Sequence, residues 1–213
     1  MRIPVVHCEK GIGELLARDR ADEAVEYFRL NCKAAEKLGA KLLVLHLWNG
    51  PISDSNIRAN FAGYDKLKPI TEEHGLLLTV ENVVCNHSDP MTHQRKLSER
   101  GAAFTFDTKM AAFHDQLMEL FAPENEAVLK NVRHLHINDY GGGYMDWKNL
   151  KTLHIGEGRI DFEKFFDRLP ENYQGDFTVE STAFLQNGSV ELEKLCNDFK
   201  RVKALAAKKY GKV

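Results

Sequence analysis

Short apolar runs rich in β-branched residues alternate with longer amphipathic stretches along the whole chain, at intervals of about 25 to 45 residues. The short runs are typical of buried strands, whereas the stretches between them repeat their apolar residues every three or four positions, as helices do. The runs lie at residues 2–8, 41–48, 76–82, 102–108, 132–138 and 177–181. This alternation predicts an α/β fold with a parallel sheet and helical crossovers.

The clearest helix is the stretch "RADEAVEYFRLNCKAAEKLG" at 20–39. Gly39 follows the last apolar position and predicts a left-handed stop, and a strand buried on both faces begins directly after it. Asp161 is expected to cap the helix that follows it, and the last helix is long and amphipathic with a basic end. The other helices are expected within 63–74, around 91–100, across 110–121, from 162 to 169 and from 190 to 210.

Composition excludes several classes of function. Apolar residues make up 43% of the 213 residues, charged residues 28%, and the formal net charge is −2. Such a chain fits a globular protein and offers no large basic field to attract a nucleic acid. The four cysteines are far apart and form no CxxC pair, which predicts reduced thiols and a cytoplasmic location. No run resembles a signal peptide or is long enough to cross a bilayer, and no linker divides the predicted domain, residues 1–213.

Every predicted strand ends in a side chain that can bind a metal or transfer a proton. In chain order these residues are His7, His46, Glu81, Asp107, His136 and Glu180. Parallel α/β folds carry their chemistry at the carboxyl ends of the strands, so these six side chains are the candidate functional residues.

A packing role without any metal explains the histidines more easily than it explains the acids. A single histidine at a strand end is most often a hydrogen-bonded packing residue. A carboxylate behind a strongly apolar run is costly to bury without a cation or a donor, which applies to Glu81, Asp107 and Glu180. His134 and His136 share one face of a strand, and only His136 is near enough to the carboxyl end to reach a site there, so His134 is expected to be a supporting residue.

Two glutamates, an aspartate and a histidine that converge on one point would form an oxygen-rich site with mixed donors. Such a site favours Mn²⁺, Mg²⁺ or Co²⁺, tolerates Zn²⁺, and leaves room for oxygens of a substrate.

The series "TVEN", "FTFDT", "HLHIND", "HIGEG" and "FTVES", in this order and spacing, resembles the xylose isomerase-like TIM barrels. This superfamily contains sugar-phosphate isomerases and epimerases and also the endonuclease IV type of repair enzyme. The resemblance runs from about residue 3 to about residue 182. It implies one divalent metal held by Glu81, Asp107, His136 and Glu180.

The resemblance further implies that Glu81 and Glu180 are catalytic and move the proton of a sugar or sugar phosphate. Removing a proton beside a carbonyl group creates an enediolate, which needs an electrophile. A carboxylate on each face of the carbon can then act as base and acid. Return of the proton to the other face of the same carbon gives epimerisation, and return to the neighbouring carbon gives isomerisation.

The chain departs from the family pattern at several positions. Many relatives read "DTGH" after the strand-borne aspartate, whereas this chain has Lys109 two positions after Asp107 and Met110 where the histidine stands. Lys109 is therefore a candidate contact for a phosphate or carboxylate, and His114 is either a substitute for the missing histidine or an ordinary surface residue. His7 and His46 match strand-end histidines that hold another zinc in endonuclease IV relatives, which makes them candidates for a second metal or a substrate contact.

Endonuclease IV relatives also carry an Asp-x-His before the glycine stretch, for a third zinc. The matching positions here are Leu150 and Thr152, neither of which is a ligand. This difference and the net charge of −2 make a DNA-repair nuclease the weaker alternative.

Two loops carry further candidate contacts. Gly156 and Gly158 either bring backbone N–H groups to a phosphate or only form a tight turn. The glycine-rich stretch 139–147 contains three aromatic residues that, together with Trp48, either line a sugar site or cover apolar surface. The three are Tyr140, Tyr144 and Trp147.

The predicted number of strands is smaller than in a complete barrel. Eight strand–helix units need about 250 residues, and the series of motifs places residues 2–8 at the third strand. We therefore expect a TIM-barrel type fold that has about six of eight units and lacks the first two. Exposed parallel edges are unfavourable, so a homo-oligomer is expected, and a non-catalytic metal- or sugar-binding relative is a further alternative.

Overall fold

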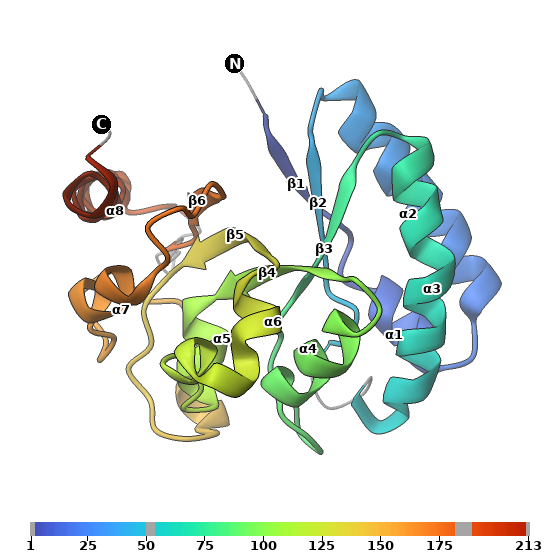
Figure 1. Ribbon diagram of the computed structural model, residues 1–213, viewed down its shortest axis with the longest axis horizontal. Coiled ribbons are helices and arrows are strands. Elements are labelled where there is room, and N and C mark those ends of the chain that lie inside the picture. The colour runs from blue at the N-terminus through green and yellow to red at the C-terminus, as the bar shows by residue number, and fades with distance from the viewer. Residues whose placement is uncertain (1–2, 50–53, 182–188, 212–213) are drawn as a thin grey trace. The chain divides into compact units, whose positions relative to one another are not determined.

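Six parallel strands form the framework of the protein. The computed structural model describes residues 3–49, 54–181 and 189–211, and within them the strands follow the order β1-β2-β3-β4-β5-β6 (Figure 1). Their bounds are β1 Val5–His7, β2 Leu42–Leu45, β3 Leu77–Glu81, β4 Ala103–Asp107, β5 Val132–Ile137 and β6 Asp176–Val179. The pairs β1·β2, β2·β3, β3·β4 and β5·β6 are all parallel. The predicted α/β class and strand positions are confirmed. Most of the strands are shorter than the predicted runs: β1 and β2 each lack residues at both ends, and β6 ends before Glu180 and Ser181. Residue 2 of the first run lies outside the described part.

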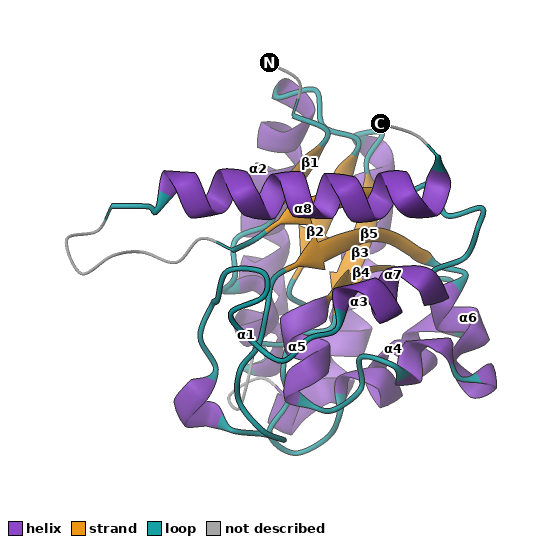
Figure 2. Cartoon of the chain, turned by 90° about the vertical axis from the view of Figure 1, so that its left-hand side faces the viewer, coloured by secondary structure: helices purple, strands orange, loops and turns teal. Residues whose placement is uncertain are grey.

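Helices fill most of the connections between strands (Figure 2). They are α1 Ile12–Ala17, α2 Ala21–Lys37, α3 Ile57–Glu73, α4 Pro90–Ser98, α5 Thr108–Phe113, α6 Glu126–Leu129, α7 Phe162–Arg168 and α8 Leu192–Tyr210. Short 3₁₀ turns lie at Asp54–Asn56, Glu119–Phe121, Pro123–Asn125 and Trp147–Asn149. No helix in these described ranges combines the length and the apolar character that a membrane span needs.

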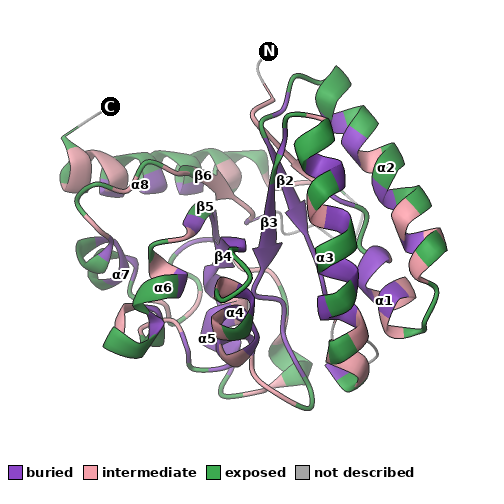
Figure 3. Ribbon diagram, turned by 45° about the vertical axis from the view of Figure 1, so that its right-hand side comes forward, coloured by how far each residue is buried: buried purple, intermediate pink, exposed green. Residues whose placement is uncertain are grey.

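The chain divides into two compact units, each with its own packing. The first comprises residues 1–105 and 130–132. In it β2 is buried along its full length, and α1, α2 and α3 pack against one another beside β1, β2 and β3 (Figure 3). Phe28 and Leu67 are fully buried, and they represent the apolar faces by which α2 and α3 contribute to this core. β1 is only half-buried, as expected for a strand at an edge.

The second unit comprises residues 106–129 and 133–213. Its core is aromatic. The Phe106 and Phe165 rings are stacked with their centres 6.1 Å apart, and the Phe166 and Phe177 rings are stacked with their centres 5.3 Å apart. Helices α7 and α8 lie side by side (Figure 2). The buried Asp198 carboxylate ties α8 to the loop before α7, because it bonds the His154 ring at 2.6 Å and accepts the Ile155 N–H at 3.0 Å.

The ends of several helices follow the predicted signals. Gly39 has a φ of +74° at the end of α2, and Gly75 and Gly101 have φ values of +65° and +68° after α3 and α4. This left-handed conformation costs a residue with a Cβ more than it costs glycine. The Asp161 carboxylate accepts the Lys164 N–H at 3.0 Å, so the predicted cap of α7 is confirmed.

The predicted single helix across 110–121 is wrong. Helix α5 ends at Phe113, and Asp115 then has a φ of +54°. The reason is a long-range competition for backbone carbonyls. The Ala112 carbonyl accepts a guanidinium N–H of Arg159 at 2.9 Å, and the Phe113 carbonyl accepts the Met145 N–H at 2.8 Å. Local periodicity could not reveal these partners, which lie more than 30 residues away.

Candidate metal centre

The second unit brings three of the predicted ligands together. Asp107 is the last residue of β4, His136 is the next to last of β5, and Glu180 directly follows β6. One ligand atom from each lies within 4.8 Å of those of the other two, and His136 Nδ1 is 3.3 Å from a carboxylate oxygen of Glu180. Asp107 and His136 are buried, with 0% and 2% of their surface exposed, and the Glu180 side chain is one third exposed. This group is named the acid–imidazole cluster below.

Asp107 is held in position by the segments on both sides of it. One carboxylate oxygen caps α5 by accepting the Met110 N–H at 2.7 Å, and the other accepts the Asn138 side-chain amide at 2.9 Å. The Asn138 carbonyl oxygen in turn accepts the Lys109 N–H at 3.0 Å, while Thr108 Oγ1 donates to the Asn138 backbone carbonyl at 2.7 Å. Each Asp107 oxygen has a second lone pair, so the carboxylate can also bind a cation.

The donor atoms of this cluster suit a divalent cation. A carboxylate that is almost completely buried needs a compensating positive charge or several donors. The set contains two carboxylates and one imidazole and no thiolate, which favours Mn²⁺, Mg²⁺ or Co²⁺ and tolerates Zn²⁺. The residues present therefore fit the metal that the resemblance implies.

The first unit forms a separate cluster from His7, His46 and Glu81. Both imidazoles approach the same oxygen of Glu81, His7 Nε2 at 3.1 Å and His46 Nε2 at 2.8 Å, and their ring centres are 4.7 Å apart. Glu81 and His46 are buried, with 1% and 4% of their surface exposed, whereas His7 is half-buried. This group is named the two-histidine cluster below.

The hydrogen bonds of His7 limit the charge states of the two-histidine cluster. His7 Nδ1 lies 2.8 Å from the Cys8 carbonyl, and since a carbonyl can only accept, Nδ1 must carry a proton. A neutral His7 then presents a bare Nε2 to the carboxylate, which is repulsive. His7 is then an imidazolium that pairs with Glu81, or Glu81 is protonated and donates to Nε2, or a cation lies between the two groups.

Lys109 and Trp48, the two remaining predicted contacts, differ in exposure. Lys109 is half-buried, and its ammonium group donates to Thr152 Oγ1 at 3.4 Å. Trp48 is fully buried, its indole N–H donates to the Val83 carbonyl at 2.6 Å, and its ring lies 5.1 Å from that of His93. Its burial favours the packing role for Trp48 over the sugar-stacking role.

Two further histidines of the second unit also have defined positions. His134 is fully buried, its Nε2 lies 3.0 Å from Thr178 Oγ1, and its ring packs edge-on against that of His136. This environment matches the supporting role expected for His134. His114 is 4% exposed and contacts the rings of Phe113 and Tyr144, so its expected position as an ordinary surface residue is wrong.

The Asp139 carboxylate holds the glycine-containing turn at residues 156–160. Its buried carboxylate accepts the backbone N–H groups of Gly156 at 2.8 Å, Gly158 at 3.0 Å and Ile160 at 3.1 Å. These N–H groups are therefore not available to a phosphate, and the tight-turn alternative is the better one. A Cβ at Gly158 would lie 2.3 Å from an Asp139 oxygen, which explains the glycine there. The sequence places Asp139 directly after a strand, but no local signal identifies residues 156–160 as its partners.

The aromatic residues of the loop 139–147 separate into one anchor and two exposed rings. Tyr140 is fully buried, and its hydroxyl donates to the Gly143 carbonyl at 2.8 Å. Tyr144 and Trp147 are 64% and 39% exposed. Only these two rings are therefore available to stack on a ligand.

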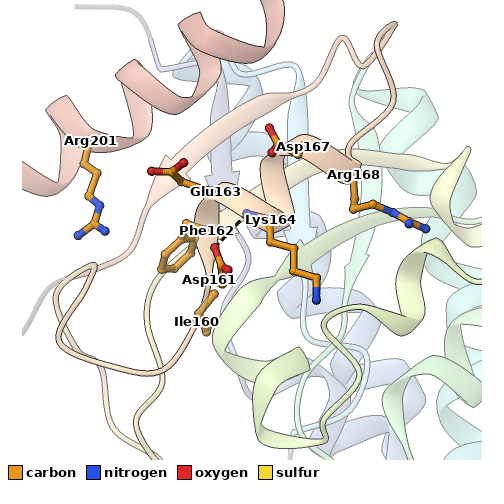
Figure 4. Close-up of a pocket in the computed structure, with 8 residues that line it drawn as sticks. All are labelled: Ile160, Asp161, Phe162, Glu163, Lys164, Asp167, Arg168 and Arg201. Atoms are coloured by element: carbon orange, nitrogen blue, oxygen red, sulfur yellow. Dashed lines mark hydrogen bonds between the residues drawn. The ribbon is translucent and has the colours of Figure 1, made fainter.

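A surface hollow of about 630 Å³ lies in the second unit beside α7 (Figure 4). Figure 4 shows its charged side chains on α7 and Arg201 on α8. The hollow is lined by Ile160, Asp161, Phe162, Glu163, Lys164, Asp167, Arg168 and Arg201. None of these residues belongs to either cluster, and positive and negative groups are mixed, so the hollow offers no site of one charge.

Parallel strands with acids and imidazoles at their carboxyl ends define a class of α/β proteins that can bind a metal there. A family model described as "Xylose isomerase-like TIM barrel" matches residues 1–194. The chain belongs to this family. No curated protein matches the chain.

Solved structures with the same fold agree with this assignment. A D-tagatose 3-epimerase-like protein is 21% identical with a TM-score of 0.72, and the match covers 94% of this chain and 76% of that protein. The IOLI protein, solved with a bound zinc atom, is 15% identical with a TM-score of 0.70, at 99% and 78% coverage. The 3-keto-D-glucoside 4-epimerase YcjR from E. coli is 14% identical with a TM-score of 0.70, at 96% and 80% coverage. At these identities the likeness is one of fold.

Proposed function

We propose that the protein is a divalent-metal-dependent isomerase or epimerase that acts on a sugar or a sugar phosphate. The observation that carries the proposal is the convergence of Asp107, His136 and Glu180, from three separate strands, within ligand distance of one another. Membership of the xylose isomerase-like family and the names of the epimerases with the same fold support the choice of reaction.

We assign Glu81 as the fourth ligand, as the family pattern implies. The bound cation would polarise the substrate carbonyl and stabilise the negative charge that develops when the neighbouring carbon loses its proton. Glu81 and Glu180 are the two carboxylates that remove and return this proton. Asn138 keeps Asp107 in the orientation needed to bind, and the one-third exposed side chain of Glu180 lies where a substrate can reach it.

Lys109 is the proposed contact for an anionic group of the substrate. Lys109 is half-buried, and its ammonium group donates to the neutral hydroxyl of Thr152 over a long 3.4 Å. An ammonium with so weak a partner is suited to a phosphate or a carboxylate. The four free cysteines support the cytoplasmic location expected for an enzyme of sugar metabolism.

Solvent exchange tests the proposed proton transfer directly. The protein, reconstituted with Mn²⁺, is incubated in D₂O with a panel of ketoses, aldoses and their phosphates, and deuterium beside the carbonyl is followed by NMR or mass spectrometry. We expect incorporation with at least one sugar, and loss of at least about 100-fold in rate for Glu180→Gln because the carboxylate that carries the proton is removed. Glu124→Gln, which changes an exposed glutamate of the same unit, is the matched control. Normal exchange in Glu180→Gln would reject the assigned role.

The two-histidine cluster could hold a second metal. This cluster is also the observation that favours the nuclease alternative. Elemental analysis of the purified protein distinguishes one bound metal from two. Two metals per chain together with cleavage of abasic DNA would favour the nuclease, whereas a loaded metal with no exchange on any sugar would indicate a non-catalytic relative.

A further inference from the structure

Helix α2 has an apolar stripe on its outer side that nothing in the described part of the chain covers. Tyr27, Leu30 and Leu38 are 48%, 57% and 51% exposed, and Ala34 lies between the last two. The steps of three and four residues place them in one row along the helix. The buried residues of α2 lie on another side of the helix, about a third of a turn away from the stripe, and Figure 3 shows buried and exposed segments alternating along the helix.

Four charged residues flank this stripe in a fixed order. Asp22 and Glu26 lie in the first half of α2, and Lys33 and Lys37 lie in the second half. Their spacing places all four on the same side of the stripe. All four are exposed, and none has an ion pair within the described residues. The neighbouring charges Glu23, Arg29 and Glu36 already pair with Arg20, Glu73 and His74.

We propose that α2 is a homodimer interface, in which two copies of the chain pack α2 against α2 in antiparallel orientation about a two-fold axis. In an antiparallel helix pair related by a two-fold axis, the flank of one helix contacts the equivalent flank of the other helix. The residues of the two flanks run in opposite directions. The acidic half of each flank therefore meets the basic half of the other. Glu26 of one copy lies beside the stretch from Lys33 to Lys37 of the second copy, and the symmetry repeats the contact.

The order of charges is what selects a second copy and its orientation. A parallel pair would place acid against acid and base against base, which is unfavourable, and an unrelated helix would need the same reversal by chance. The antiparallel pair also brings the large Tyr27 opposite the small Ala34 of the second copy, so that each ring has room. Leu38 of the second copy then reaches the beginning of α2, where Glu23 and Tyr27 line a surface hollow of about 340 Å³.

Sedimentation equilibrium and light scattering over a range of protein concentrations test the interface. We expect a mass of twice the 24.2 kDa of one chain for the wild-type protein. Leu30→Glu places a carboxylate in the centre of the stripe and should raise the dimer dissociation constant by at least about 100-fold. The matched control is Leu192→Glu, which changes a leucine of α8 that is 70% exposed and should leave the mass unchanged. Circular dichroism should show the same helix content in both variants.

Charge reversal tests the orientation without touching the apolar stripe. Glu26→Lys and Lys33→Glu should each weaken the dimer about tenfold, because each creates two repulsive contacts by symmetry. The double variant restores opposite charges between positions 26 and 33 of the two copies and should return the dissociation constant to within about threefold of the wild-type value. A wild-type protein that is monomeric at about 100 μM would overturn the proposal. A dimer that survives Leu30→Glu, or one that the double variant does not restore, would overturn it equally. Neither result would bear on the metal site, since α2 carries none of its residues.

Discussion

At the scale of single residues, the buried polar groups around the acid–imidazole cluster support its geometry. Asn138 is the most connected of them, because it links the Asp107 carboxylate, the Lys109 backbone and the Thr108 hydroxyl. Removing one partner from such a buried network leaves the others unsatisfied, and this costs more than an exposed hydrogen bond contributes.

We expect Asn138→Ala to lower the free energy of unfolding by about 1–3 kcal/mol and the affinity for Mn²⁺ by about 10–100-fold, because Asp107 loses the group that orients it. Urea denaturation and calorimetric titration measure the two effects. Asn149→Ala is the control, since Asn149 is exposed and its amide bonds only the half-buried Asp146. Equal effects of the two substitutions would contradict the positioning role of Asn138.

Because the His93 ring is buried, we expect the stability of the protein to depend on pH. It is 2% exposed, neither ring nitrogen has a hydrogen-bond partner in the described part of the protein, and its ring contacts those of Trp48 and Phe61. Burial lowers the pKa of His93 from 6.5 to about 4, against the opposing effect of Asp89. The unfolded chain therefore binds a proton more readily than the folded one, and the contribution of His93 to stability is complete above pH 6.5 and falls as the pH approaches 4.

Between pH 7.5 and pH 5 we expect this residue to account for a loss of about 2 kcal/mol in the free energy of unfolding. The loss should be smaller by that amount in His93→Phe, where no proton can bind. Urea denaturation of both proteins at the two pH values gives the difference, in which the shared effects of other groups cancel. Parallel pH profiles for the two proteins would show that His93 is not the group responsible.

At the scale of elements, the close approach of α1 to the end of β2 positions the two-histidine cluster. A Cβ on Gly13 would lie 2.6 Å from the backbone oxygens of His46 and Leu47. The buried Asn60 amide secures the same contact by donating to the carbonyls of Gly13 at 2.7 Å and Leu47 at 2.6 Å. Helix α1 was not among the predicted elements, because it is short and its apolar residues follow β1 too closely to show a separate period.

Gly13→Ala should lower the free energy of unfolding by about 1–3 kcal/mol, because the clash is with backbone atoms that cannot rotate away. Gly143→Ala is the matched control, since a Cβ there meets nothing within 4 Å. Thermal denaturation of both variants measures the difference. A Gly13→Ala protein as stable as the control would show that α1 can move away from β2 at little cost.

For the whole molecule, binding of the proposed cation should be coupled to folding of the chain. Acids and imidazoles brought together from distant strands repel or compete for protons until a cation binds, and a ligand that binds only the folded chain stabilises it. The two-histidine cluster and the acid–imidazole cluster each contribute to this effect if each takes a cation.

Addition of Mn²⁺ at 100 times its dissociation constant should stabilise the protein by about 2.7 kcal/mol, or raise the melting temperature by about 5–11 °C for a chain of this length. Treatment with EDTA should reverse the shift. His136→Ala should abolish most of it, whereas His74→Ala, which changes a histidine paired only with the exposed Glu36, should retain it. Calorimetric melting curves measure each shift, and an equal response in His136→Ala would exclude His136 as a ligand.

Local patterns along the chain were enough to predict the class of fold, the positions of the six strands and the residues at their carboxyl ends. Period, β-branching and capping residues are local properties, so the left-handed turn at Gly39 and the cap at Asp161 could be predicted from a few neighbours. Which of these groups contact one another depends on long-range packing. Only folding could show that Asn138 orients Asp107 and that Asp139 takes the N–H groups of the glycine loop.

The same reason explains the errors. Helix α5 stops at Phe113 because Arg159 and Met145 bind its last carbonyls. These hydrogen bonds join residues that are far apart in the chain, and no local pattern encodes them. A sequence lists which chemical groups are available at each strand end, but only the packing of the chain determines which partners compete for them.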